Sequence, residues 1–262
     1  MKTIAQACCD VLLTPDPRAK VMAARAAARD WRLGRLSYSF DAPMPERPAR
    51  PALPELLHPH RMPRRGKAGS ERSRIAMLHA LAHIEFVAID LAFDCAGRFG
   101  ADFDSTFADD WVRVGAEEAM HFALLSRRLQ SLGSFYGALP AHDGLWEAAE
   151  ETAHDVMARL AIVPMVLEAR ALDITPATIE RFSMAGDATS ARMLGWIMQD
   201  EIRHVSAGTK WFVAAANRGG FDAPESYQIL VNRHFRGSLK PPFNDSARSQ
   251  AGLTREFYAA LA

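Results

Sequence analysis

The chain has 262 residues, 49% of them apolar, and its 31 basic side chains equal its 31 acidic ones in number. This length and composition suffice for one large core with appendages and exclude a chain that is disordered throughout. No apolar run approaches the roughly 20 residues of a membrane span and no export pattern opens the sequence, so we expect a cytoplasmic protein with no membrane partner.

The cysteines exclude two kinds of site, and the charge distribution suggests one kind of partner. None of the three cysteines belongs to a C-x-x-C pair, so they indicate neither a disulfide framework nor a thiolate zinc site. Residues 1–75 carry 15 Lys and Arg against 7 Asp and Glu, whereas residues 76–262 carry 16 against 24. Such a basic segment can bind nucleic acid or an acidic partner, but packing on the acidic remainder is the simpler interpretation.

The first third of the chain is predicted to be a helical arm followed by an extended strap. Apolar residues recur at three- and four-residue intervals over 4–13 and 17–33, which predicts two helices broken near Pro15. Residues 43–63 contain seven prolines, which favour extended structure because each lacks a donor and restricts its predecessor. We assign residues 1–69 to this basic arm and strap.

Residues 70–220 are predicted to form a four-helix bundle. Long helices are expected over 70–98 and from an N-cap at Ser105 or Thr106 to a stop before Gly133. The segment 143–172 should kink at Pro164, and Thr175 should cap a short helix that begins with Pro176. The last long helix is expected over 187–217, and residues 221–262 add a helix to about His234 and a strap at 240–243. No strand pattern is present, so the expected fold class is all-α.

The connector between the second and third long helices conflicts with one unbroken third helix. If 143–172 were a single helix level with its neighbours, residues 133–142 would have to span more than about 50 Å. Ten extended residues reach only about 35 Å. The segment that contains Trp146 and His154 must therefore bend or form a separate helix.

Four Glu-x-x-His pairs could each aim a carboxylate and an imidazole at one metal ion, because residues three apart share a helix face. They are Glu55/His58, Glu118/His121, Glu151/His154 and Glu201/His204. The first lies in the strap. His154 would sit about 21 Å from the level of Glu168, 14 residues further along the chain, so the third pair is interpreted as a solvated helix face.

Spacing selects the other two pairs. Glu85 precedes Glu118 by 33 residues, and Glu168 precedes Glu201 by the same interval, so the pattern of a Glu followed by a Glu-x-x-His pair occurs twice. Antiparallel packing of consecutive helices would bring the carboxylates level. Buried carboxylates need cations, so this doubled pattern predicts a metal site.

Four carboxylates and two imidazoles suit two divalent ions. The predicted ligands are Glu85, Glu118, His121, Glu168, Glu201 and His204. In this hypothesis Glu118 and Glu201 bridge the ions, while Glu85 and Glu168 are terminal and pair with His121 and His204. Nitrogen and oxygen ligands without thiolate favour iron, suit manganese as well, and leave zinc as an alternative.

Neighbouring polar residues could support these ligands. Glu117 and Asp200 each precede a ligand glutamate and could accept a hydrogen bond from a ligand histidine, and Arg203 could hold Asp200. Exposed charges on a helix face remain the alternative for Glu117 and Arg203. His79 and His83, four residues apart, are interpreted as structural.

The run Asp200–His204 resembles the D-E-x-R-H motif of oxygen-activating di-iron enzymes of the ferritin-like superfamily. A closer resemblance covers most of the chain: the runs His79–Glu85, Glu117–Phe122, Leu139–Trp146 and Leu239–Asn244 are similar to a bacterial ferritin-like family catalogued as a domain of unknown function. The resemblance implies a ferritin-like bundle with a long crossover and the ligands above, but no substrate. A more distant similarity is to the di-iron hydroxylase of a modified tRNA adenosine.

Three functions are compatible with these sequence features. The first is an oxidase or hydroxylase that uses O2, an external electron donor and a small-molecule or modified-RNA substrate, and that could act as a homodimer. The second is iron handling by ferroxidation, storage or sensing. The third is an RNA-associated binding protein with a structural metal site, in which Arg61, Arg64, Arg65 and Lys67 contact phosphates.

Overall fold

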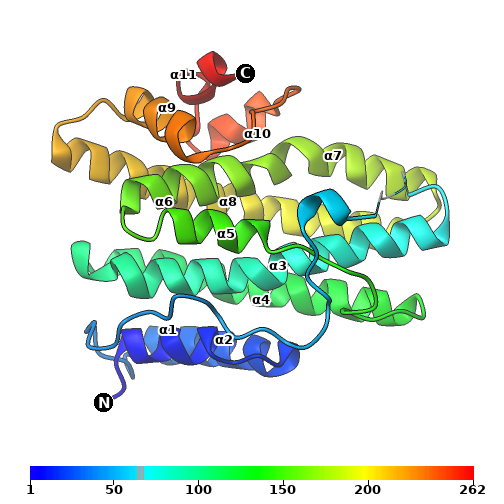
Figure 1. Cartoon of the computed structure of the whole chain (residues 1–262), viewed down its shortest axis with the longest axis horizontal. Helices are drawn as coiled ribbons and strands as arrows, with labels where there is room; N and C mark the ends of the chain where they lie inside the picture. The colour runs from blue at the N-terminus through cyan, green and yellow to red at the C-terminus, as the bar shows by residue number, and fades with distance from the viewer. Residues whose placement is uncertain (64–65, 67) are drawn as a thin grey trace. The chain divides into compact units, whose positions relative to one another are not determined.

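Helices make up the regular structure of this computed structural model, which describes residues 1–63, 66 and 68–262 (Figure 1). Among these residues the extended segments form isolated bridges and no strand, so the chain is all-α, as predicted. The chain divides into two compact units, Met1–Trp146 and Glu147–Ala262. The division into an arm, a central bundle and a C-terminal extension stays a prediction.

The first unit is built on two long helices. These helices, α3 (Glu71–Phe99) and α4 (Ser105–Ser131), lie side by side and are joined by the short turn η2 (Gly100–Asp102) (Figure 1). The two arm helices cover them, with α1 (Ile4–Leu12) on α3 and α2 (Pro17–Arg32) on α4. The basic arm of the first unit is therefore folded onto the pair that carries Glu85, Glu118 and His121.

Side-chain caps define where these helices begin. Thr3 and Gln6 form a capping box at α1, and Asp16 caps α2 in front of Pro17 at the first helical position. Asp104 caps α4 by accepting from the Thr106 N–H at 2.9 Å, so the predicted cap at Ser105 or Thr106 was late. A carboxylate is a strong cap because its charge also complements the positive end of the helix.

The strap of residues 43–63 is extended, with one short turn, η1 (Pro59–Arg61). It pairs with the connector 133–142, because the Leu57 N–H donates to Ala141 O at 2.8 Å and the Ala141 N–H donates to Glu55 O at 2.9 Å. This pairing confirms the predicted extended conformation and places Glu55/His58 outside any helix longer than one turn.

The segment after the connector is not one unbroken helix, as predicted. The chain passes from the first unit to the second within α5 (Gly144–Glu151), a separate short helix that ends before His154. A new helix, α6 (Val156–Ile162), then begins after Asp155, whose carboxylate accepts from the Met157 N–H at 2.8 Å.

The second unit packs its remaining helices around α8. Its long elements are α7 (Ala169–Met184), α8 (Ala188–Gly219) and α9 (Ala223–His234), and its C-terminal elements are α10 (Asp245–Gln250), α11 (Arg255–Tyr258) and η4 (Ala259–Leu261). Both α6 and α7 pack on α8, and α9 packs on α6. Gly220, at φ +71°, ends α8 in the left-handed conformation that glycine adopts without strain, two residues beyond the predicted range 187–217.

Pro164 distorts its helix, whereas Pro176 does not interrupt α7. The predicted kink at Pro164 is realised as a π-helical segment, η3 (Val163–Glu168), between α6 and α7. The predicted helix start at Thr175-Pro176 is wrong, because α7 runs continuously through Pro176. Proline removes one backbone donor, and the Asn244 side chain instead donates to Leu172 O at 3.1 Å, which compensates the lost bond.

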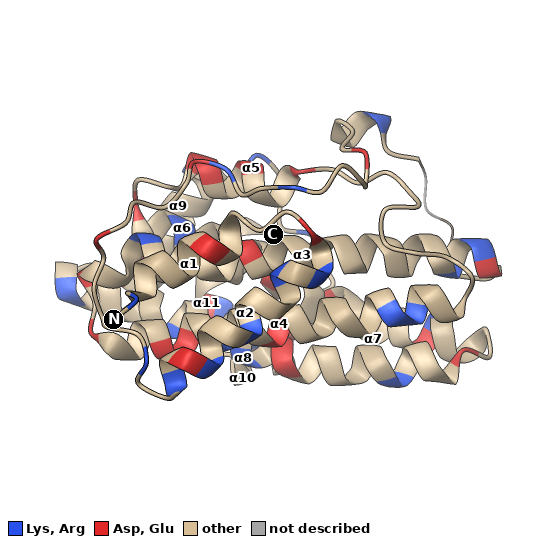
Figure 2. Cartoon of the chain, turned by 90° about the horizontal axis from the view of Figure 1, so that it is seen from below, with Lys and Arg blue, Asp and Glu red and all other residues tan. Residues whose placement is uncertain are grey.

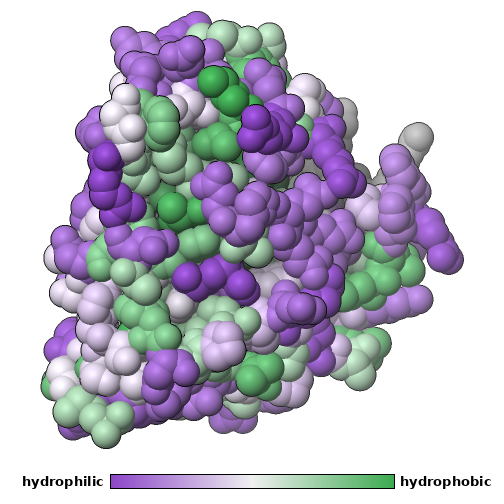
Figure 3. Space-filling model, turned by 60° about the vertical axis from the view of Figure 1, so that its left-hand side comes forward, coloured by the Kyte–Doolittle hydropathy of each residue, from purple (hydrophilic) through white to green (hydrophobic). Residues whose placement is uncertain are grey.

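One described helical stretch, Glu71–Asp102, is long and apolar enough to cross a membrane by length and composition, but 67% of its apolar window is buried inside the chain. This is weak evidence for a membrane span and is consistent with the core helix of a soluble protein. On the face shown in Figure 3, hydrophilic and hydrophobic residues are interspersed.

Candidate metal centre

The two Glu-x-x-His pairs selected by spacing lie on buried helix faces. On α4, Glu118 and His121 are each 1% exposed and share their face with the buried residues Val114 and Leu125. On α8, Glu201 and His204 are 5% and 0% exposed. Ionisable side chains are rarely buried to this degree unless they are paired or bind a cation.

In the first unit, three predicted ligands converge. The His121 Nδ1 atom lies 3.2 Å from Glu85 Oε2 and 3.5 Å from Glu118 Oε2. Glu85, on α3, is 6% exposed, so carboxylates from two helices meet one imidazole in a buried place. One ligand atom from each of these three residues lies within 4.8 Å of the others, which is close enough for a shared metal ion.

In the second unit, His204 Nδ1 lies 3.6 Å from Glu201 Oε1 on the same helix. Glu168 is the last residue of the π-helical segment η3 and is half-buried. Over the described residues, the buried side chains that could bind a metal ion are Glu85, Glu118, His121 and Glu201. The ligand roles of Glu168 and His204 stay predictions.

The donor chemistry of these residues fits a divalent metal. Carboxylate oxygens and imidazole nitrogens suit iron, manganese and zinc alike, and no thiolate is present in the set. Several carboxylates this deeply buried would carry a large desolvation penalty as bare anions, and a cation removes most of it. The residues therefore fit the predicted group, while the identity of the metal is open.

The predicted supporting residues have different surroundings. The Arg203 Nη2 atom donates to Asp200, so the predicted contact between them is present, at side-chain exposures of 51% and 20%. Glu117 is half-buried and lines a groove between α2 and α4. Its hydrogen bond to a ligand histidine stays a prediction.

His79 and His83 act structurally, as predicted from the sequence. The Gly137 N–H, at 2.9 Å, and the Leu139 N–H, at 3.4 Å, donate to His79 Nε2, which ties the connector to α3. Acceptance requires a neutral ring, and burial lowers the pKa of His79 to about 4.

His83 contacts two polar groups of the same connector. Its Nε2 lies 3.1 Å from the carbonyl oxygen of His142, which can only accept, so Nε2 carries the proton and Nδ1 accepts from the Tyr136 hydroxyl at 2.9 Å. Burial, aided by the nearby charge of Arg50, lowers the pKa of His83 to about 3. Both histidines therefore hold the connector against α3.

Sequence reasoning missed a buried ionic network beside the aromatic ring of Phe86. Lys20 Nζ, on α2, donates to Asp90 on α3, and Arg50 of the strap donates to the other Asp90 oxygen. The ammonium lies 5.6 Å and the guanidinium 5.7 Å from the centre of the Phe86 ring. The sequence does contain one indication of this network. Asp90, five residues after Glu85, is the acidic residue within an otherwise apolar run.

Comparison with known proteins gives a family but no activity. The family described as "Protein of unknown function (DUF455)" matches residues 13–259. The chain belongs to this family. It is also 42% identical over 211 residues to an uncharacterized protein of Haemophilus influenzae, a match that covers 78% of this chain and 73% of the relative. No solved structure matches the chain significantly. The family match agrees with the predicted resemblance to a domain of unknown function. Because neither the family nor the relative has a described activity, a functional proposal has to start from the geometry of the candidate metal ligands.

Proposed function

We propose that this member of the DUF455 family is a ferritin-like four-helix protein that binds two iron ions and uses O2 to oxidise or hydroxylate an organic substrate. The observation that carries the proposal is the convergence of Glu85, Glu118 and His121 at a buried place in the first unit. The equal 33-residue intervals and the second buried Glu-x-x-His pair on α8 support a matching half-site in the second unit.

Each ligand has a proposed role. Glu118 and Glu201 would be the ligands shared by both ions, Glu85 and His121 would complete the ligand set of one ion, and Glu168 and His204 would complete that of the other. Iron is favoured, manganese also suits these ligands, and zinc is the alternative without redox chemistry. When bound and reduced, iron supplies the activation of O2, for which the chain needs an external electron donor. We place the protein in the cytoplasm.

Neighbouring side chains shield the carboxylates of Glu85 and Glu118 and the imidazole of His121 from water. Glu85 Oε2 lies 3.2 Å from His121 Nδ1, a separation at which both atoms could bind one ion. Phe86 and Phe122, each next in sequence to a predicted ligand, are 0% and 3% exposed and pack with their ring centres 5.2 Å apart. These rings exclude water from the side of α3 and α4 on which they lie, which strengthens electrostatic interactions nearby.

Metal content measured with and without one ligand tests the proposal. Chelator-treated protein, reloaded with Fe(II) without oxygen, should hold about two ions per chain, change its absorption spectrum on exposure to air and consume O2 when a reductant is supplied. Glu118→Ala and Glu201→Ala should each lose most of the bound iron and the spectral change.

A matched control is available in the chain. Glu151 is the last residue of α5, so its Glu-x-x-His pair with His154 does not share a helix face as the sequence predicted; its side chain is 37% exposed and contacts Arg236. Glu151→Ala should keep about two ions. Unchanged iron content in Glu118→Ala would overturn the metal site. Iron far above two per chain after loading in air would favour storage over the proposed oxidase.

A further inference from the structure

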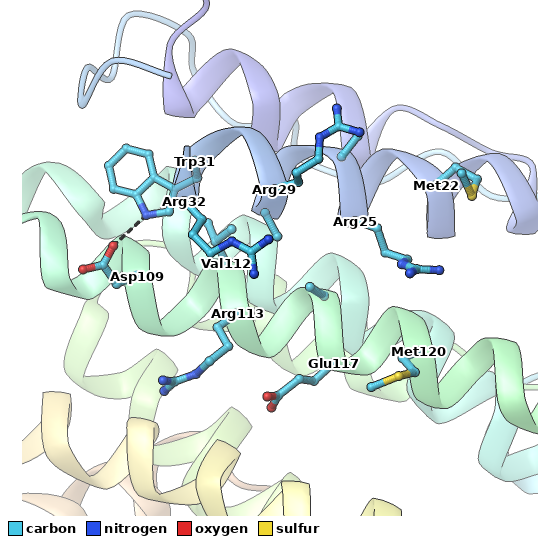
Figure 4. A pocket seen from close by; sticks show the side chains of 13 residues that line it. Met22, Arg25, Arg29, Trp31, Arg32, Asp109, Val112, Arg113, Glu117 and Met120 are labelled. Carbon is cyan, nitrogen blue, oxygen red and sulfur yellow. Dashed lines mark hydrogen bonds between the residues drawn. The ribbon is translucent and has the colours of Figure 1, made fainter. Parts of the chain in front are cut away.

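A groove runs between α2 and α4 in the first unit and encloses about 950 Å³ (Figure 4). All of its lining residues belong to these two helices, within Met22–Arg32 and Asp109–Met120. This volume lies in the range of pockets that hold small organic ligands. The groove is separate from the buried faces of Glu118 and His121, although Glu117 and Met120 of its lining precede those residues on α4.

Four arginines are among the residues that line the groove. Arg25, Arg29 and Arg32 follow one another at four- and three-residue intervals and so share a face of α2, whereas Arg113 belongs to α4 and its side chain extends away from α2 (Figure 4). Basic residues recur along α2 in Figure 2 as well. Two carboxylates, Asp109 and Glu117, also line the groove, so positive charge is in excess.

Two of the four guanidinium groups are satisfied locally. Arg29 Nε donates to Asp30 at 3.0 Å, and Arg113 Nη2 donates to Asp110 at 2.8 Å. Within the part of the chain that the structure describes, Arg25 and Arg32 have no hydrogen-bond or ion-pair partner. Their seven-residue separation corresponds to about 10 Å along the helix axis, so they could bind two acidic groups of one elongated ligand.

The groove also offers apolar surface. Met22 and Met120 contribute thioether side chains that are 60% and 48% exposed. Trp31 lies at the other end of the groove, where its indole N–H donates to Asp109 at 2.7 Å. This hydrogen bond engages one of the two carboxylates that line the groove. Methionine side chains adapt readily to flat ligands. Free guanidinium groups beside adaptable apolar surface are the combination that recognises an organic anion.

We propose that this groove binds an organic phosphate of nucleotide size, with its acidic groups on Arg25 and Arg32 and its apolar part against Met22 and Met120. Guanidinium groups match phosphate oxygens because they present paired N–H donors in one plane. The proposal stands on the groove alone and does not depend on metal binding.

Isothermal titration calorimetry with three probes tests both halves of the proposal. ATP combines phosphate and a flat base, whereas tripolyphosphate and adenosine each supply one part. ATP should bind more tightly than either fragment, and its affinity should fall as salt is added because exposed charges are screened. No heat of binding with ATP at concentrations up to about 1 mM would overturn the proposal.

Single substitutions then locate the binding site. Arg25→Ala and Arg32→Ala should each weaken ATP binding about tenfold or more, because each removes a charge-assisted hydrogen bond. Arg72→Ala is the matched control, since Arg72 is an exposed arginine of α3 outside the groove and should leave the affinity unchanged. Circular dichroism of each variant confirms folding. Equal weakening by all three variants, or weakening by neither groove variant, would show that ATP binds elsewhere.

Discussion

Lys20 shows how one buried charge can join three segments of the first unit. Its side chain is fully buried, and its ammonium donates to Val11 O at 3.0 Å and Leu12 O at 3.2 Å as well as to Asp90. The two carbonyl groups belong to the last turn of α1, whose partial negative charge favours a cation. Lys20 therefore caps α1 from α2 while it is paired with α3.

The ion pair of Lys20 and Asp90 should be much more sensitive to truncation than an exposed pair. Burial lowers the pKa of Lys20 and raises that of Asp90, and each partner's charge opposes the shift of the other. Asp90→Ala would leave two cations, Lys20 and Arg50, without their shared partner, so we expect a loss of about 3–5 kcal/mol in the free energy of unfolding.

Urea unfolding followed by circular dichroism measures this loss. Asp10→Ala removes a carboxylate from the exposed pair Lys2–Asp10, with side-chain exposures of 46% and 63%, and should cost no more than about 1 kcal/mol. Equal effects of Asp90→Ala and Asp10→Ala would contradict the inferred importance of the buried network.

His79 should make the stability of the first unit depend on pH. Its pKa falls from an ordinary value of 6.5 to about 4 in the folded chain, so the unfolded chain binds the proton more readily. The stabilisation is complete above pH 6.5 and is lost as the pH falls from there toward 4. Wild type should therefore exceed His79→Gln in stability at neutral pH, and this advantage should shrink on acidification. A difference that stays constant between pH 7 and pH 4 would argue against this role.

At the scale of helices, α8 contains two glycines with opposite expected effects. A Cβ at Gly208 would collide with the ring of Pro164, so this glycine allows the kinked segment η3 to approach α8 closely. A Cβ at Gly195 would meet nothing within 4 Å. Gly208→Ala should lower the stability of the second unit by about 1–3 kcal/mol, whereas Gly195→Ala should raise it by about 0.5–1 kcal/mol.

Thermal unfolding of the two single variants tests this pair of expectations. Both substitutions make the same chemical change in the same helix, so helix propensity alone predicts two equal gains in stability. A gain at Gly208 equal to that at Gly195 would show that the contact between α8 and Pro164 relaxes without cost.

Sequence patterns predicted most helices because their signals are local. Apolar periodicity, caps and terminal glycines lie within the helices that they define, as for Asp16 of α2 and Gly220 of α8. The failure at Pro176 has a nonlocal cause, since the donor to Leu172 O is Asn244, 72 positions along the chain. A local rule that expects proline at a helix start contains no information about that partner.

The same distinction applies to the candidate site. Spacing found Glu85, Glu118 and His121 because a helix pair converts equal distances from a turn into equal levels. Spacing could not find the contact between Lys20 and Asp90, which joins residues 70 positions apart through tertiary packing. The groove could be predicted only in part. The spacing of the α2 arginines can be read from the sequence, but the packing of α4 beside them cannot.

At the scale of the whole molecule, the proposed ligands are divided between the two units. Glu85, Glu118 and His121 belong to the first unit, and Glu168, Glu201 and His204 belong to the second. If one pair of ions is held by ligands from both, metal binding stabilises the folded form of both units, by about 2.7 kcal/mol for each ion when the free metal is at 100 times its dissociation constant. Added Fe(II), without oxygen, should then raise the unfolding midpoint of the wild type.

The distribution of ligands gives this prediction a sharp test, because substitutions in either unit should remove the same stabilisation. Glu118→Gln and Glu201→Gln conserve side-chain size but lose a ligand charge, so neither variant should be stabilised by Fe(II), whereas the control Glu151→Gln should respond as the wild type does. If Fe(II) still stabilises Glu201→Gln fully while Glu118→Gln has lost the effect, the metal is held by the first unit alone. That outcome would reject the two-unit centre and keep the half-site formed by Glu85, Glu118 and His121.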